Sequence, residues 1–306
     1  MDAQGSVNVA SAPASRRHWI YQRLSPYLFL LPVTVVLVGI LLGPTIFAGF
    51  VSFATYDMFG GTMKYAGLQN YSKIAADPEF FQSLGNTLVY TLLTVGVEFL
   101  FGLGIALLLN RELPGMGVIR ALVIAPWILS DVIAGLDWRM MLQDNYGVVN
   151  YLLGVLWAPA GSTPWLSAPG WAMVSVVLAD VWHNTPFVAL LLLAGLQAIP
   201  QEPFEAARID GASSWRTFRH VTVPLLSPAI FAVVLFRTMF AFREFTVPWT
   251  ITSGGPSNST ELLSIYLYKQ MLTFFNFGTA SAVSVVMLAL TILATLAFLR
   301  GLFREL

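Results

Sequence analysis

The chain has 306 residues, of which 57% are hydrophobic and only 10% are charged, and its mean hydropathy is +0.72. Soluble domains carry about a quarter charged residues, so this composition excludes an ordinary soluble domain and indicates a chain solvated mainly by lipid. Cysteine is absent and the formal net charge is zero, which excludes a disulfide framework and a thiolate metal site and argues against a nucleic-acid partner.

The start of the chain predicts a tail followed by a membrane span. Residues 1–24 begin with an Ala- and Ser-rich stretch without periodicity, which predicts a disordered cytoplasmic tail. The apolar segment at 27–50 is too long for the core of a secretory signal and ends without a clear small-residue cleavage site. We therefore expect an uncleaved first span and one transmembrane domain over residues 25–306.

Six segments are long and apolar enough to cross a bilayer, which requires about 20 residues in a helix. The third and fifth are the least apolar because they carry ionisable groups. The sequence thus predicts an all-α integral membrane protein with spans at 27–50, 86–109, 118–142, 171–196, 225–250 and 278–302.

Basic residues in the connections predict the orientation, because Lys and Arg concentrate on the cytoplasmic side. With six spans and both termini in the cytoplasm, the outer connections hold only Lys64, Lys73 and Lys269. The inner side holds Arg16, Arg17, Arg23, Arg111, Arg120, Arg208, Arg216, Arg219, Arg300 and Arg304.

Two outer connections are rich in aromatic residues. The connection at 52–85 is expected to contain a short interfacial helix around 70–76. The connection at 143–170 has no Lys or Arg and contains Trp157 and Trp165 among prolines. Both compositions fit either an aromatic belt at the membrane surface or contact with an external partner.

Ionisable residues within the predicted spans each cost at least about 2 to 3 kcal/mol unless they are paired or hydrated, so they must face protein or a water-filled cavity. Glu98 is expected to pair with a neighbouring helix, whereas Asp137 and Arg139 lie near an outer end and are expected to be solvated. The full set is Glu98, Asp131, Asp137, Arg139, Asp180, Arg237, Arg243 and Glu244.

The fourth span groups polar residues next to a proline. Asp180, His183 and Asn184 precede Pro186, which removes one backbone donor. This pattern predicts a broken helix with a free carbonyl near Trp182 and a candidate substrate site. His183 is expected to form structural hydrogen bonds without a catalytic role.

A polar segment at 201–224 joins the fourth and fifth spans. Good helix formers at 201–208, Gly211 as a left-handed turn and Ser213 or Ser214 as a cap predict two short helices, the second running to residue 224.

The second of these helices carries an apolar stripe. Trp215 and Phe218 recur at helical spacing with Val221 or Thr222. The physical pattern alone fits a surface that docks on a partner or an amphipathic loop that lies on lipid headgroups.

The fifth span places polar residues on one face. Arg237, Ala241 and Glu244 are separated by four and three residues, which predicts a shallow polar notch on that face. Arg243 is expected to point elsewhere and to pair with a carboxylate of a neighbouring helix.

The polar segment resembles the EAA loop of permease subunits of binding-protein-dependent ABC importers. Glu205-Ala206-Ala207 is followed by Gly211 and, after nine intervening residues, by Val221 and Val223-Pro224, where the family usually has Ile and Leu in place of these valines. Other motifs similar to the maltose and trehalose branch are Gly67-Leu68-Gln69-Asn70-Tyr71, Asn86-Thr87, Ala125-Pro126-Trp127, Trp182 with Thr185-Pro186-Phe187, Ala198-Ile199-Pro200-Gln201-Glu202 and Thr252-Ser253-Gly254-Gly255-Pro256-Ser257-Asn258-Ser259-Thr260.

The resemblance implies a type I ABC importer permease fold that carries a di- or oligosaccharide. It implies two functional groups of residues. The implied substrate-binding residues are Trp127, Asp131, Asp180, His183, Asn184, Phe187, Arg237, Ala241 and Glu244. The implied ATPase-coupling residues are Glu205, Ala206, Ala207, Asp210, Gly211, Trp215, Phe218 and Pro224.

The resemblance also implies partners: a second homologous permease, a dimer of ATP-binding subunits, and an extracellular or periplasmic substrate-binding protein, in a bacterial or archaeal plasma membrane. No metal or cofactor is expected in this chain, since ATP and Mg would be bound by the ATPase. The chain is not expected to be an enzyme, because it contains no Gly-x-x-x-x-Gly-Lys-Ser/Thr motif.

Two alternatives stay open. Glycerol phosphate or another polar solute is possible in the same family, because Arg237 is suited to a phosphate or carboxylate. An ion-coupled secondary transporter would use Asp131, Asp180 and Glu244 as coupling groups, although the inverted repeats typical of that class are not seen.

Overall fold

The computed structural model describes residues 27, 29–57, 60–111 and 114–305, so the predicted tail at 1–24 lies outside the described residues. Contacts separate the chain into Met1–Phe50 and Val51–Leu306. Most of the helical run Phe29–Ser52 belongs to the first unit. The run contains a π-helical turn, η1 (Val38–Leu42), followed by α2 (Gly43–Val51). This run is long and apolar enough to cross a membrane.

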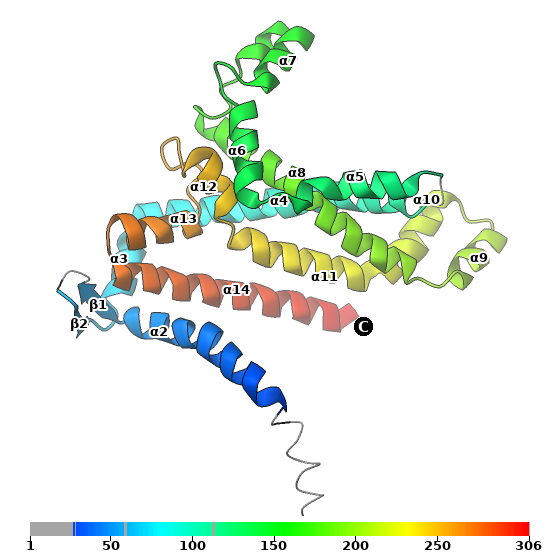
Figure 1. The fold of residues 1–306 in the computed structure, drawn as a ribbon. Helices are drawn as coiled ribbons and strands as arrows, with labels where there is room; N and C mark the ends of the chain where they lie inside the picture. The colour runs from blue at the N-terminus through cyan, green and yellow to red at the C-terminus, as the bar shows by residue number, and fades with distance from the viewer. Residues whose placement is uncertain (1–26, 28, 58–59, 112–113, 306) are drawn as a thin grey trace, which may run out of the picture. The chain divides into compact units, whose positions relative to one another are not determined.

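The second unit is mostly helical, which confirms the predicted fold class (Figure 1). Its long helices are α4 (Pro78–Leu109), α5 (Met116–Ile128), α8 (Pro169–Gln197), α11 (Val223–Phe242) and α14 (Phe277–Glu305). Its shorter elements are α3 (Gln69–Ala76), α6 (Asp131–Met141), α7 (Val148–Leu156), η2 (Ala158–Ser162), α9 (Glu202–Ile209), α10 (Ser214–Thr217), η3 (Phe218–Thr222), α12 (Thr246–Thr252), α13 (Leu263–Tyr268) and η4 (Lys269–Thr273).

Five helices in the described part are long and apolar enough to cross a membrane, or six if α5 and α6 form one bent span. The third predicted span, at 118–142, is therefore not one straight helix. Leu129 and Ser130 are extended, with ψ of 152° and 140°, and α6 departs from α5 at 91°. This bend turns α6 across the direction of the long helices (Figure 1).

The core of the unit lies where α4 and α8 pack along each other. Ala106 and Leu109 of α4 are buried against Val188 and Leu192 of α8. Gly102 permits this approach, because a Cβ at that position would lie 2.5 Å from Val188 Cγ1. The absence of a side chain at Gly102 therefore sets how closely the two helices meet.

One end of the unit holds α3, α13 and a hairpin that was not predicted (Figure 1). Strands β1 (Ala54–Asp57) and β2 (Thr62–Tyr65) pair antiparallel, with Ala54 opposite Tyr65. The helix predicted around 70–76 is confirmed as α3. Asn70 ties α3 to the hairpin, since its Nδ2 donates to Ser52 O at 2.9 Å and to Ala54 O at 2.8 Å.

The opposite end of the unit holds α9 and α10, joined at Gly211 as predicted (Figure 1). Gly211 has φ of +69°, and Ala212 N–H donates to Ala207 O at 2.9 Å, which is a Schellman closure. Ser213 Oγ accepts from Arg216 N–H at 3.4 Å and so caps α10.

The second helix of this corner differs from the prediction, because it does not end near residue 224. It continues from α10 through the π-helical η3 into α11, and Val223 N–H donates to Phe218 O. Pro224 lies in the first turn of α11, and the wider π turn before it relieves the clash that a proline ring makes with a preceding carbonyl. The corner is thus directly continuous with a membrane-length helix.

Candidate substrate cavity

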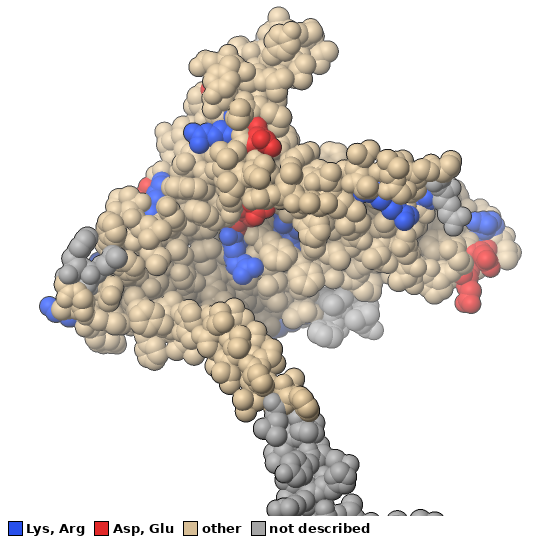
Figure 2. Space-filling model, in the orientation of Figure 1, with Lys and Arg blue, Asp and Glu red and all other residues tan. Residues whose placement is uncertain are grey.

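A polar cavity of about 560 Å³ lies between α5, α6, α8 and the end of α11. Figure 2 shows acidic and basic side chains near the middle of a surface that is otherwise mostly uncharged. The lining residues are Trp127, Asp131, Asn184, Phe187, Arg237, Phe240, Arg243 and Glu244. Six predicted substrate-binding residues therefore come together here, whereas Asp180, His183 and Ala241 are buried and do not line the cavity.

An aromatic wall forms one part of the cavity. The ring centroids of Trp127 and Phe187 are 5.6 Å apart, and those of Phe187 and Phe240 are 6.4 Å apart. Trp127 and Phe240 are 44% and 45% exposed, so their ring faces are available to a ligand. Flat apolar faces beside hydrogen-bonding groups are suited to the mixed surface of a polyol.

A buried ion cluster borders the cavity, because Arg237 is one of the lining residues. Arg237 Nε donates to Glu98 Oε2 at 2.5 Å, and Arg237 Nη2 donates to Glu98 Oε1 at 2.6 Å and to Asp180 Oδ2 at 3.0 Å. The prediction that Glu98 pairs with a neighbouring helix is confirmed. The polar notch differs from the prediction, because Arg237 does not present a free charge there. The residue is only 4% exposed and is paired with two carboxylates.

The ion cluster extends to the cavity through Asn184. Asn184 Nδ2 donates to Asp180 Oδ1 at 2.9 Å, so the carboxylate that binds Arg237 also orients this amide. On the same helix, His183 Nε2 lies 2.8 Å from Asp131 Oδ1, which agrees with a hydrogen-bonding role for His183. Buried groups on α8 therefore hold two polar groups at the cavity surface.

The fourth span was predicted to break near Pro186, and this prediction is wrong. α8 continues through Pro186 as a single helix from Pro169 to Gln197. A proline removes one hydrogen bond, but the surrounding helices bury Pro186 and its neighbour Thr185 and keep the segment helical.

The fifth span ends earlier than predicted, because α11 ends at Phe242. Glu244 lies beyond the helix, where its Oε1 accepts from Val247 N–H at 3.1 Å in the first turn of α12. Arg237 and Ala241 still share a buried helix face, and Glu244 reaches the cavity through the break instead of through helical periodicity.

Arg243 was expected to pair with a carboxylate, and this prediction is also wrong. Among the described residues its guanidinium forms no ion pair, and its Nε donates to Met239 O at 3.2 Å. Its guanidinium carbon lies 5.9 Å from the centre of the Phe240 ring. Arg243 and Phe240 are the lining residues that the sequence prediction missed. Phe240 could have been predicted, because it lies three residues after Arg237 and therefore on a similar face of the helix.

Asp137 and Arg139 are exposed on α6, as expected for solvated groups, and Arg139 Nη1 donates to Thr250 O at 3.3 Å. Within the described residues, no group of three or more His, Cys, Asp or Glu is placed to hold a metal ion. The cavity therefore offers hydrogen bonds, charges and ring faces as its means of binding a ligand.

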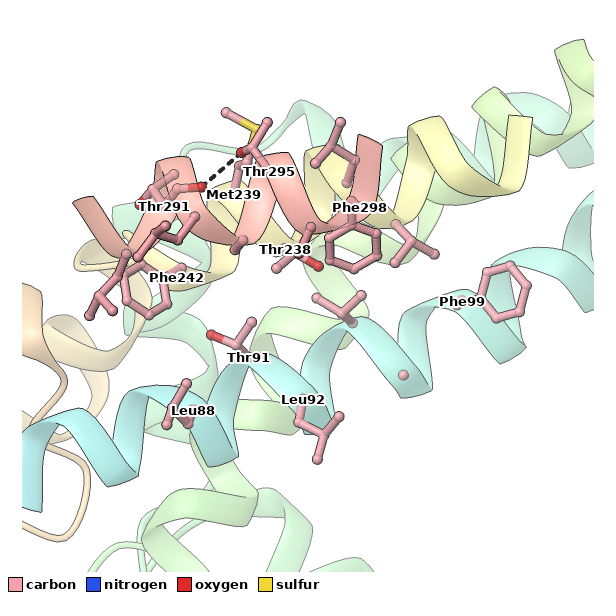
Figure 3. Close-up of a pocket in the computed structure, with 18 of the residues that line it drawn as sticks. Leu88, Thr91, Leu92, Phe99, Thr238, Met239, Phe242, Thr291, Thr295 and Phe298 are labelled. Carbon is pink, nitrogen blue, oxygen red and sulfur yellow. Dashed lines mark hydrogen bonds between the residues drawn. The ribbon is translucent and has the colours of Figure 1, made fainter. Parts of the chain in front are cut away.

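A larger cavity of about 800 Å³ lies between α4, α11 and α14 and has a different character (Figure 3). Its wall is formed mainly by aliphatic and aromatic side chains such as Leu88, Phe99 and Phe298, with threonines but without charged residues. It contains none of the predicted substrate-binding residues, and its apolar wall is unsuited to a polar solute.

The predicted coupling residues lie along α9, α10 and the start of α11. Glu205, Ala206 and Asp210 are exposed, while Ala207 is half-buried. Trp215 is 68% exposed and stacks on Phe218, with ring centroids 5.5 Å apart. Ile209, which the prediction did not include, is 86% exposed beside them and extends the apolar surface of this corner.

Membrane-length helices around a polar, partly aromatic cavity are the arrangement expected of an integral membrane transport permease. The chain matches the family described as "Binding-protein-dependent transport system inner membrane component" over residues 11–304. It belongs to this family and is a transport component in the membrane.

Two relatives agree with this assignment, and a solved structure shares the fold. The chain is 38% identical over 283 residues to the trehalose/maltose transport system permease protein MalF of Thermococcus litoralis, covering 91% of this chain and 94% of the relative. It is 36% identical over 279 residues to the sulfoquinovosyl glycerol transport system permease protein SmoG of Agrobacterium fabrum, covering 91% and 90%. A bacterial alginate ABC transporter, solved with an alginate pentasaccharide-bound periplasmic protein, contains a chain with the same fold at TM-score 0.78 and 20% identity, covering 91% and 95%.

Proposed function

We propose that this chain is one of two permease subunits of an ATP-driven importer and that its polar cavity binds a neutral di- or oligosaccharide. The observation that carries the proposal is the pairing of an aromatic wall, Trp127 and Phe187, with the hydrogen-bonding groups of Asp131, Asn184 and Glu244 in one cavity. Carboxylates and amides bind paired hydroxyl groups, and ring faces cover the C–H surface of a sugar. A relative whose name refers to trehalose/maltose transport supports this substrate class.

The charge of the cavity favours a neutral solute over glycerol phosphate. Arg237 is held by Glu98 and Asp180, so it has little capacity left for an anionic ligand. Asp131 and Glu244 add two further carboxylates to the lining. Arg243 is the lining cation without an ion pair among the described residues, and it is the group that an anionic solute would have to use.

The exposed corner at 201–224 supports a separate ATPase as the source of energy. Trp215 and Ile209 offer an apolar surface beside the carboxylates of Glu205 and Asp210. Because α10 runs without a break into α11, movement of the corner would be transmitted to the helix that carries Arg237. In this proposal, the ATPase dimer binds ATP and Mg, the companion permease closes the other side of the path, and an extracellular or periplasmic binding protein delivers the sugar.

We propose a bacterial or archaeal plasma membrane with both termini in the cytoplasm, which the ten inner arginines support. Reconstitution in liposomes tests the function. The chain with its companion permease, ATPase and binding protein should take up the binding protein's sugar only with internal ATP. Uptake by this chain alone under an ion gradient, without an ATPase, would establish an ion-coupled secondary transporter instead.

A further inference from the structure

A separate cavity of about 650 Å³ lies where α4, α5, α8 and α9 meet. Three arginines converge on it from two parts of the chain: Arg111 follows α4, Arg120 lies on α5 and Arg208 lies on α9. Asn110 and Gln201 add polar groups to the same lining. We call this the arginine cavity.

The three guanidinium groups are not neutralised by carboxylates in the described part of the chain. None of them takes part in an ion pair there, and no acidic side chain among the described residues lines the cavity. The nearest acids in sequence are Glu205 and Asp210 on either side of Arg208, and Glu112, which lies outside the described residues. A formal charge of three thus faces one cavity of the size of a small ligand.

Arg120 is oriented by a contact that leaves part of it free. Its Nη2 donates to Leu109 O at 2.9 Å, which satisfies one carbonyl at the end of α4. Its Nε–H is buried and has no hydrogen-bond partner among the described residues. Capping of a helix end therefore explains one contact of Arg120, whereas the buried, unpartnered donor calls for an acceptor that the described residues do not supply.

The walls of the arginine cavity indicate what kind of anion fits. Leu107, Met116 and Phe204 provide apolar surface beside the arginines, and Leu107 belongs to a helix of membrane length. A phosphate group accepts several charge-assisted hydrogen bonds from arginines, and basic pockets between membrane helices bind the headgroups of acidic lipids. A free phosphate would use the arginines but not the apolar walls.

We infer that the arginine cavity binds the phosphate of an acidic phospholipid headgroup from the adjacent leaflet. The site is independent of which solute the polar cavity carries. Arg208 lies on α9, in the segment 201–224, whereas Arg111 and Arg120 lie where α4 is connected to α5. One bound headgroup would therefore connect the segment 201–224 to the membrane helices. The lipid thereby restrains the position of α9.

Native mass spectrometry of the intact, delipidated transporter complex tests this inference. The probes are dioctanoyl phosphatidylglycerol, dioctanoyl phosphatidylcholine and inorganic phosphate. We expect one phosphatidylglycerol per copy of this chain, bound at least about tenfold more tightly than phosphatidylcholine. Arg111→Gln should weaken this binding by about tenfold, and Arg111→Gln with Arg120→Gln should abolish the preference for phosphatidylglycerol.

The matched control is Arg219→Gln with Arg300→Gln, which removes two exposed arginines that do not line the cavity. Arg120→Lys keeps the charge but removes the Nε donor, and should retain only part of the affinity. An equal loss of binding in the control pair would overturn the site, because it would indicate diffuse surface charge. Binding of inorganic phosphate as tight as that of phosphatidylglycerol would overturn the lipid assignment. Dissociation of the ATPase from the Arg111→Gln/Arg120→Gln complex with lipid binding unchanged would assign the arginines to that interface and would also overturn it.

Discussion

Arg237 of α11 and Glu98 of α4 form a two-point ion pair, with N–O distances of 2.5 and 2.6 Å, in which both side chains are almost completely buried. Asp180 of α8 accepts from the same guanidinium at 3.0 Å. Three membrane-length helices are therefore joined at one cation, and two buried carboxylates depend on it.

This dependence predicts unequal effects of neutralising the partners. Arg237→Gln leaves Glu98 and Asp180 without their cation and should destabilise the complex by about 3 to 5 kcal/mol. Glu98→Gln leaves the Arg237–Asp180 pair and an amide acceptor, and should cost about 1 kcal/mol. Thermal unfolding of the purified complex measures both. Equal losses of stability would contradict the cluster geometry.

The hydrogen bond from Asn184 to Asp180 predicts coupled effects on transport. Asn184→Ala should raise the KM for the solute, and Asp180→Ala should do the same although Asp180 does not line the cavity, because it removes the acceptor that orients the Asn184 amide. The double variant should be less than additive, with a coupling of about 0.5 to 3 kcal/mol. Uptake kinetics with unchanged assembly would check this, and full additivity would remove Asp180 from the positioning of Asn184.

Arg243 predicts how the importer responds to solute charge. Arg243→Gln should change the KM for a neutral sugar less than threefold, or about 0.65 kcal/mol. If the true cargo is an anionic solute, the same substitution should raise the KM for that solute about tenfold or more. The measurement is ATP-driven uptake with the cognate binding protein and solute. Arg243→Lys serves as the control that keeps the charge. A tenfold loss for a neutral sugar would show that Arg243 binds hydroxyl groups directly.

The close contact of α4 and α8 predicts contrasting results for two glycines on one helix. Gly102→Ala would place a Cβ 2.5 Å from Val188 Cγ1 and should destabilise the protein by about 1 to 3 kcal/mol. Gly104→Ala has no heavy atom within 4 Å and should be neutral or stabilising by up to about 1 kcal/mol. Thermal unfolding of the two variants compares them directly, and equal effects would contradict the packing.

The left-handed turn at Gly211 predicts sensitivity in the coupling corner. Gly211→Val puts a β-branched residue at φ of +69° and should strain the α9–α10 junction by at least about 1 to 2 kcal/mol. Membrane insertion should persist, while co-purification with the ATPase and ATP-driven uptake should fall. Gly117→Ala, where a Cβ meets open space, is the control. Normal uptake and co-purification by Gly211→Val would argue against docking at this corner.

The apolar length of the segments was enough to predict an all-helical membrane chain, because a bilayer demands that each span satisfy its own backbone hydrogen bonds. Local signals were also sufficient for α3 and for the turn at Gly211, where a positive φ selects glycine. The hairpin at 54–65 escaped prediction because its pairing lies in a connection read only as aromatic and interfacial.

Tertiary structure decided the details of the polar cavity. Pro186 remains within a continuous helix because its neighbours bury it, and α11 ends at Phe242, which places Arg243 and Glu244 outside helical periodicity. The cost of burying charge could be read from residue type alone, and it indicated that Glu98 needs a partner. The partner of Glu98 is Arg237, and Arg237 also binds Asp180. These contacts join residues that lie 139 and 57 positions apart in the chain, and local sequence patterns do not encode them.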